Sequence, residues 1–83
     1  MNRLELRQLL DTERFDPEVY SLDGGLLNDK LCISVEGGRW CVYYSERGSR
    51  FDLEFFATEK EACEELLQRL RELPPSQTRQ RAP

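Results

Sequence analysis

The stretch WCVYYSERGSRFDLEFF, residues 40–56, decides the fold that the sequence predicts. Apolar and polar residues alternate on both sides of Arg47-Gly48, which is the period-two pattern of half-buried β-strands around a turn. A third alternating segment, KLCISVE at 30–36, comes before it. The three segments predict a three-stranded antiparallel meander with one apolar face.

The strand register follows from keeping the apolar residues on one face of the sheet. Gly37 and Gly38 predict a tight first hairpin, because both accept the positive φ angles of a type I′ turn. A three-residue loop in the second hairpin would bury Asp52 and Glu54 without partners, which is too costly for two ions. We therefore expect a second loop of even length. The pairs that this loop predicts are Tyr44 with Phe51, Val42 with Leu53, and Trp40 with Phe55.

Two amphipathic helices flank the predicted strands. The first is expected over about residues 3–11, where Asn2 and Glu5 have the spacing of a capping box. The second begins after Thr58 and is stopped by Pro74-Pro75. Each helix has a single apolar stripe, so both helices are expected to cover the same, apolar face of the sheet.

The length of the chain allows one small core. With 83 residues, of which 39% are hydrophobic, there is no room for a second domain. We expect an α+β domain over 1–73 in the order helix, three antiparallel strands, helix (αβββα). Residues 74–83 are rich in Pro, Gln and Arg and are expected to form a disordered tail.

The composition argues against several classes of protein. The chain has no histidine and three cysteines without metal-ligand spacing, so neither a metal site nor a cofactor is expected. No nucleophile or phosphate-binding motif is present, and an enzyme is therefore not expected. There is no long apolar run and no secretory leader at the N-terminus, which predicts a cytoplasmic protein without a membrane partner.

The charge distribution favours a basic protein partner. The net charge is −4, and the tail carries Arg79 and Arg81 without an acid, so residues 1–73 carry −6 (−4 minus 2). Such a surface disfavours nucleic acid and speeds association with a basic protein, although solubility alone would also account for it. The predicted topology is shared by double-stranded RNA-binding domains. Those domains hold phosphates with lysines at the start of the last helix, where this chain has TEKEACEE, residues 58–65.

The predicted register places Tyr43, Asp52 and Glu54 together on the second face of the sheet. Since both helices are needed on the apolar face, no element remains to cover this one. An aromatic side chain with carboxylates beside it has the composition of an interface anchor with a polar rim. For the two carboxylates, an ordinary solvated sheet face is the alternative.

Three segments of the chain resemble a family of small bacterial immunity proteins, whose genes lie beside those of polymorphic, contact-delivered toxins. They are YSLDGG at 20–25, RWCVYYSERG at 39–48 and FFATEKEACEELL at 55–67, within a match over roughly 15–70. The resemblance implies a non-catalytic inhibitor in the cytoplasm. Such a protein would occlude the active site or substrate cleft of a cognate toxin with a basic cleft.

Four further residues become candidates for partner binding because they lie in the matching segments: Tyr20, Asp23, Glu46 and Arg47. For Tyr20 a role in packing the core is the alternative, and for Glu46 and Arg47 it is simple exposure at a hairpin tip. A second functional hypothesis is an acidic adaptor or regulatory subunit with a nontoxin partner. The product of the adjacent upstream gene would separate the two hypotheses.

Overall fold

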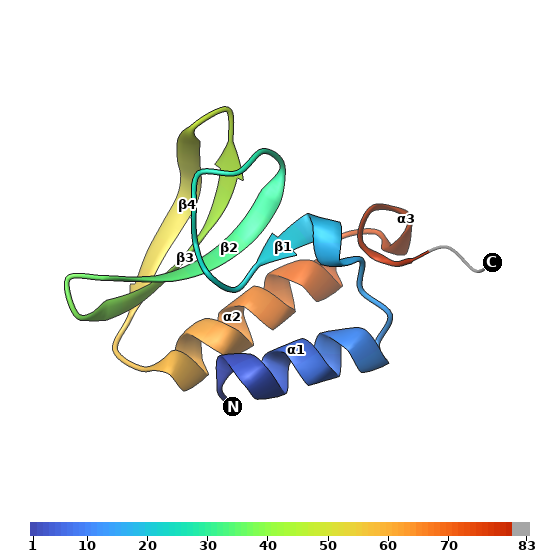
Figure 1. Cartoon of the computed structure of the whole chain (residues 1–83), viewed down its shortest axis with the longest axis horizontal. Helices are drawn as coiled ribbons and strands as arrows, with labels where there is room; N and C mark the ends of the chain where they lie inside the picture. The colour runs from blue at the N-terminus through green and yellow to red at the C-terminus, as the bar shows by residue number, and fades with distance from the viewer. Residues whose placement is uncertain (81–83) are drawn as a thin grey trace.

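The computed structural model describes residues 1–80 of the chain, which form an α+β fold (Figure 1). Four strands make one mixed sheet in the order β1-β2-β3-β4. The elements follow one another as α1 (Arg3–Thr12), the 3₁₀ turn η1 (Pro17–Val19), β1 (Tyr20–Ser21), β2 (Lys30–Glu36), β3 (Arg39–Glu46), β4 (Ser49–Phe56), α2 (Glu59–Glu72) and α3 (Pro75–Thr78).

The predicted meander is confirmed, but it is not the whole sheet. Strands β2, β3 and β4 pair antiparallel, and the first hairpin has the predicted register, with Val35 opposite Trp40 and Ile33 opposite Val42. The prediction of only three strands is wrong, because β1 pairs in parallel with the start of β2. A strand of two residues is too short to show the alternation by which strands are recognised in a sequence.

The second hairpin has the expected even loop, yet its register changes part-way along β4. Tyr44 lies opposite Phe51 as predicted, whereas Val42 lies opposite Glu54. Asp52, with a φ of +54°, and the residue after it together oppose Tyr43, which makes a β-bulge. The predicted pairs Val42 with Leu53 and Trp40 with Phe55 are therefore wrong, and Trp40 is paired with Phe56 instead.

The bulge reverses the faces of the residues that follow Phe51. Leu53 packs against the small cluster of Cys32, Cys41 and Tyr43 on one side of the sheet. Glu54 bonds to α2 on the other side. Asp52 and Glu54 thus lie on the helix side, and the prediction that they share a face with Tyr43 is wrong.

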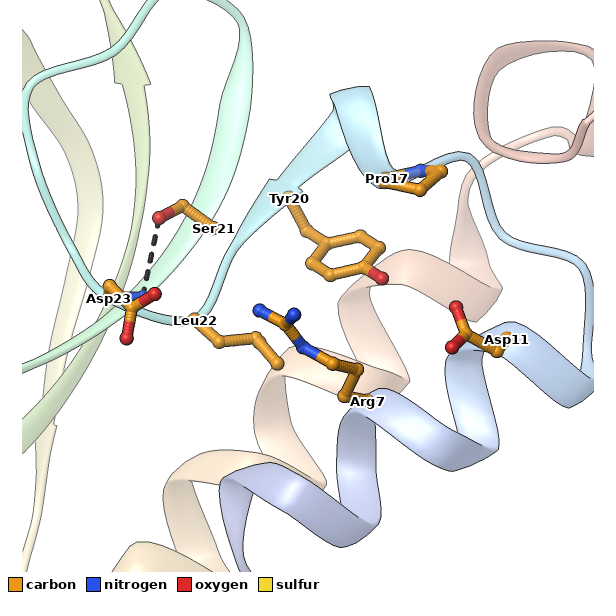
Figure 2. Close-up of a pocket in the computed structure, with 7 residues that line it drawn as sticks. All are labelled: Arg7, Asp11, Pro17, Tyr20, Ser21, Leu22 and Asp23. Atoms are coloured by element: carbon orange, nitrogen blue, oxygen red, sulfur yellow. Dashed lines mark hydrogen bonds between the residues drawn. The ribbon is translucent and has the colours of Figure 1, made fainter.

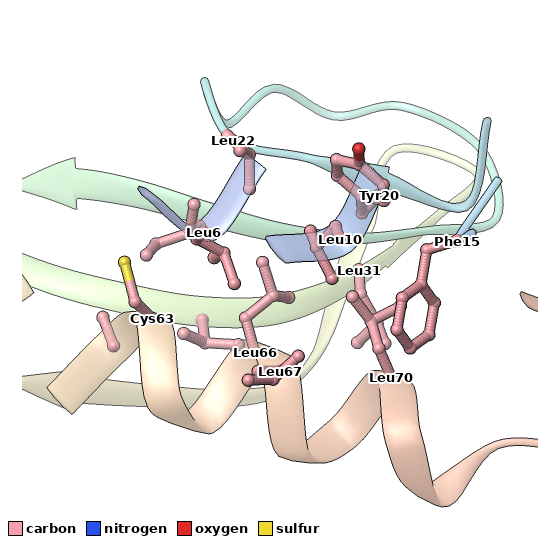
Figure 3. Packing of buried hydrophobic residues seen from close by; sticks show 13 residues of the cluster. Leu6, Leu10, Phe15, Tyr20, Leu22, Leu31, Cys63, Leu66, Leu67 and Leu70 are labelled. Atoms are coloured by element: carbon pink, nitrogen blue, oxygen red, sulfur yellow. The ribbon is translucent and has the colours of Figure 1, made fainter. Parts of the chain in front are cut away.

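Both helices lie on one side of the sheet, as predicted, and the main core is between them and the strands (Figure 3). Helix α1 begins with the predicted capping box, in which Asn2 Oδ1 accepts from the Glu5 backbone N–H at 2.8 Å. Thr58 Oγ1 caps α2 by accepting from the Glu61 backbone N–H at 3.2 Å. The fully buried residues Leu6, Leu10, Ile33, Val42, Leu66 and Leu70 belong to this core.

The loop at 22–29 covers part of the opposite face. Tyr43 Oη donates a hydrogen bond to the Gly25 carbonyl at 2.7 Å. At Gly24 a Cβ atom would lie 2.7 Å from Ser34 Oγ, and its φ is +71°, so this close approach of the loop to the sheet requires glycine. The expectation that no element remains to cover this face is wrong, because an irregular loop covers it.

The segment after α2 packs on the beginning of the fold. The Thr78 carbonyl accepts from the Asp16 N–H at 2.8 Å, and the Gln80 N–H donates to the Arg14 carbonyl at 2.9 Å. The Arg79 guanidinium lies 3.4 Å from the centre of the Phe15 ring. For residues 74–80 the predicted disordered tail is thus replaced by α3 and a docked end, whereas 81–83 lie outside the described residues. Within 1–80, neither long helix has the length and apolar character needed to cross a bilayer.

Candidate protein-binding groove

A groove of about 280 Å³ lies between the β3–β4 hairpin and the C-terminal end of α2. Leu31, Tyr44 and Leu73 supply its apolar lining. Asp52 from the bulge and Glu72 from the last turn of α2 form its acidic rim. We call this feature the acidic groove. The strands β2, β3 and β4 and the helix α2, which supply its lining, are labelled in Figure 1.

Arg69 is the cation of the acidic groove, and its charge is already matched. Its Nε donates to Glu65 Oε2 at 2.6 Å, and its Nη2 donates to Glu54 Oε1 at 3.0 Å. Nη1 is buried without a hydrogen-bond partner among residues 1–80. Within the same residues, neither Asp52 nor Glu72 takes part in a salt bridge, so the negative charge of the rim is left uncompensated.

Two more carboxylates extend the acidic groove toward the hairpin tip. Tyr44 Oη donates to Asp29 Oδ1 at 3.0 Å. Burial, this hydrogen bond and the negative charges of Asp29 and Glu46 all raise the pKa of Tyr44 above its ordinary value. Asp29 and Glu46 also line a small hollow with Asn28 and Arg47, so the negative region continues from the groove to the tip.

Exposed apolar side chains stand at the border of the acidic groove. Phe51 is directly opposite Tyr44 on β4 and shares its face, with 48% of its surface exposed. Leu73, which follows the last residue of α2, is 38% exposed. An apolar lining with exposed apolar neighbours and a charged rim is the composition of a surface that binds another protein.

The structure brings four of the predicted binding residues to this end of the molecule. Asp52 lines the acidic groove, Glu54 holds Arg69 at its edge, and Glu46 and Arg47 lie at the adjoining hairpin tip. The Arg47 backbone N–H donates to Asn28 Oδ1 at 3.0 Å, which ties the tip to the preceding loop.

Tyr43 lies elsewhere and is not an exposed anchor. Only 2% of its surface is accessible, because it is enclosed by the loop at 22–29 and the ring carries the Arg50 guanidinium at 5.2 Å. Burial raises the pKa of its hydroxyl to about 12. The expectation that Tyr43 lies open on a sheet face is therefore wrong; its side chain holds the loop on the sheet.

Tyr20 and Asp23 meet at a second hollow, of about 250 Å³, between α1 and the β1 segment (Figure 2). Arg7 and Asp11 of α1 face them across it. Tyr20 is buried in the main core, and burial followed by the charge of Asp11 raises the pKa of its phenol. Asp23 is exposed and lies 3.7 Å from Arg3. This hollow is more polar than the acidic groove and has no exposed large apolar side chain in its lining.

Sequence reasoning missed most of the acidic groove, because Asp52 is the one predicted binding residue among the six that line it. Asp29, Tyr44, Glu72 and Leu73 were not predicted as binding residues, because they come from a loop, a strand and a helix end that only the tertiary fold brings together. One signal was available. Leu73 is the last apolar residue before Pro74-Pro75, so it stands where the helix stops and cannot be covered by a further turn.

No cluster of three or more metal-ligating side chains is present in the part of the chain that the structure describes. The three cysteines are buried and free, and burial raises the pKa of the Cys63 thiol to about 11, so this thiol is protonated at neutral pH. Comparisons with protein families, with curated proteins and with solved structures found no match.

Proposed function

We propose that the chain is a non-catalytic immunity protein that binds a cognate bacterial toxin in the cytoplasm and occludes its active site or substrate cleft. The acidic groove is the observation that carries this proposal, because its rim carboxylates, Asp52 and Glu72, have no salt bridge within residues 1–80. A toxin that acts on nucleic acid has a basic cleft, and an acidic partner fills such a cleft with complementary charge. The three segments that resemble immunity proteins support the same partner.

The acidic groove also supports a protein partner over a small substrate. It is open, and it is lined by Leu31, Tyr44 and Leu73 without a nucleophile and base pair beside them. Phe51 and Leu73 at its border would be covered when a protein docks there. Inhibition by occlusion needs only such a surface and no chemistry from the chain itself.

The test is co-expression of the chain with the product of the adjacent upstream gene. We expect that product to arrest growth when it is expressed alone and to lose toxicity when the chain is present. The purified pair should elute as one complex in size-exclusion chromatography. A complex without any effect on growth would favour the acidic adaptor with a nontoxin partner, and the absence of both protection and a complex would overturn the proposal.

A further inference from the structure

We infer that the acidic groove receives a basic peptide segment of the partner, with one apolar side chain seated between Tyr44 and Leu73 and lysine or arginine side chains against Asp52 and Glu72. The identity of the partner rests on the proposed function. The chemistry of the segment rests on the acidic groove alone, and it can be tested without the toxin.

The apolar lining sets the first requirement for the segment. Leu31 is buried and belongs to the main core, so the floor of the acidic groove is rigid. Tyr44 is half-buried and Leu73 is exposed, and these two walls lose water-accessible apolar surface when a side chain enters between them. A volume of about 280 Å³ is enough for one leucine or phenylalanine side chain.

The charge of the acidic groove sets the second requirement. One guanidinium, that of Arg69, is surrounded by the carboxylates of Asp52, Glu54, Glu65 and Glu72. One positive charge minus four negative charges leaves a local formal charge of −3. A segment that buries the apolar lining must lie against the carboxylates of this rim. Only lysine or arginine side chains beside its apolar residue would be attracted to them.

The other side of the sheet gives the contrast that makes the acidic groove specific. There Arg39 stacks on Phe55 with 4.1 Å between the guanidinium carbon and the ring centre, and makes no salt bridge within residues 1–80. Arg50 pairs with Glu36 and also lies over Tyr43. A basic segment would meet two arginines on that side, so electrostatics directs it to the acidic groove.

The experiment measures fluorescence anisotropy of a short labelled peptide in which one leucine has lysines on both sides. Binding to the full chain should weaken steeply as salt is added. Two control peptides, one with serine in place of leucine and one with glutamates in place of the lysines, should bind at least about tenfold more weakly. Amide shifts in an NMR titration should move most at Tyr44, Asp52 and Leu73.

Variants of the chain locate the binding site. Asp52→Asn and Glu72→Gln should each weaken peptide binding by about threefold, as expected for exposed charges. Leu73→Ser should weaken it by about tenfold. Glu64→Gln, at an exposed position of α2 outside the lining of the acidic groove, and Leu26→Ser, which is 59% exposed, are the matched controls and should bind as the wild type does.

Two results would overturn the inference: no binding of the lysine peptide, or binding that the two control variants weaken and the three groove variants do not. Neither result depends on whether the chain neutralises a toxin. Conversely, peptide binding at the acidic groove without protection of cells would leave the inference standing and overturn the proposed function. Circular dichroism of each variant confirms that the fold is retained.

Discussion

The two faces of the sheet are buried in different ways. On one face α1 and α2 enclose thirteen buried residues with the strands. On the other, an irregular loop at 22–29 covers Cys32, Cys41 and Tyr43, a cluster of three. The comparison teaches that a loop can cover a sheet face when its backbone comes close enough, which here depends on Gly24 and on the hydroxyl of Tyr43.

The two faces also carry opposite charges at the level of β4. The bulge at Asp52 sends Asp52 and Glu54 to the helix side, where they border the acidic groove. The loop side keeps Arg39 and Arg50. A single inserted residue therefore sends the two carboxylates of β4 to the side opposite Arg39 and Arg50, and it places the candidate binding surface beside the helices.

The largest expected effect is a loss of stability, and it should differ between the two buried clusters because they are buried to different extents. Leu66→Ala should lower the free energy of unfolding by about 2 to 5 kcal/mol, because Leu66 is fully buried between α2 and the sheet. Leu53→Ala on the loop side should cost about 1 kcal/mol, since Leu53 is only partly buried. Chemical denaturation measures both. Equal losses would mean that the loop side contributes as much to stability as the helix side.

The second prediction concerns the bulge that separates the charges. Asp52→Val should destabilise the fold by about 1 to 2 kcal/mol, because a β-branched residue is strained at a φ of +54°. Asp52→Gly should be neutral or slightly stabilising at the same position. The measurement is the denaturation midpoint of the two variants. If Val and Gly behave alike, residue 52 does not adopt the left-handed conformation and the strand pairs without a bulge.

The third prediction tests the loop as a cover. Tyr43→Phe removes the hydrogen bond to the Gly25 carbonyl and keeps the ring, so it should cost about 0.5 to 1.5 kcal/mol. Amide hydrogen exchange should become faster at 22–29 and remain unchanged in α1 and α2. Unchanged exchange in the loop would show that Tyr43 does not hold it.

Much of the fold could be predicted because local and tertiary preferences agree. Gly37 and Gly38 fix the first hairpin, and the pairs on the helix side of the sheet then place apolar beside apolar, as Ile33 with Val42. Asn2 and Thr58 mark the helix starts by side-chain caps that need no tertiary contact. These signals are short-range, so the sequence carries them in full.

The bulge could not be predicted from alternation, because RFDLEFF alternates as a regular strand would. Phe55 and Phe56 are adjacent, so either could face the core, and only packing against Trp40 decides in favour of Phe56. The prediction of the candidate site depends on the same choice of face. Since the face of Asp52 and Glu54 depends on the bulge, their surroundings were predicted wrongly, and their part in partner binding stays a prediction.

The smallest expected effect concerns an ion pair that joins the ends of the helix layer. Arg71 of α2 donates two hydrogen bonds to the carboxylate of Glu13, which caps α1, and Arg79 lies 3.8 Å from the same carboxylate. The pKa of Glu13 lies below its ordinary value of 4.5, chiefly because of the hydrogen bond from Arg71. Burial acts in the opposite direction, and the positive charges of Arg71 and Arg79 lower the pKa further. A lowered pKa means that the folded state favours the ionised form.

The stabilisation from Glu13 is therefore present above pH 4.5 and is lost as the pH falls through the lowered pKa of the folded state. Glu13→Gln should lower the melting temperature by no more than about 5 °C at neutral pH, because the pair lies at the surface and is screened. The difference in melting temperature from the wild type should shrink in acid and vanish below the pKa of Glu13 in the folded state.

Glu64→Gln on the exposed side of α2 is the control and should change the melting temperature little at any pH. A gap between wild type and Glu13→Gln that stays constant from neutral pH into acid would show that the carboxylate acts through packing and not through its charge.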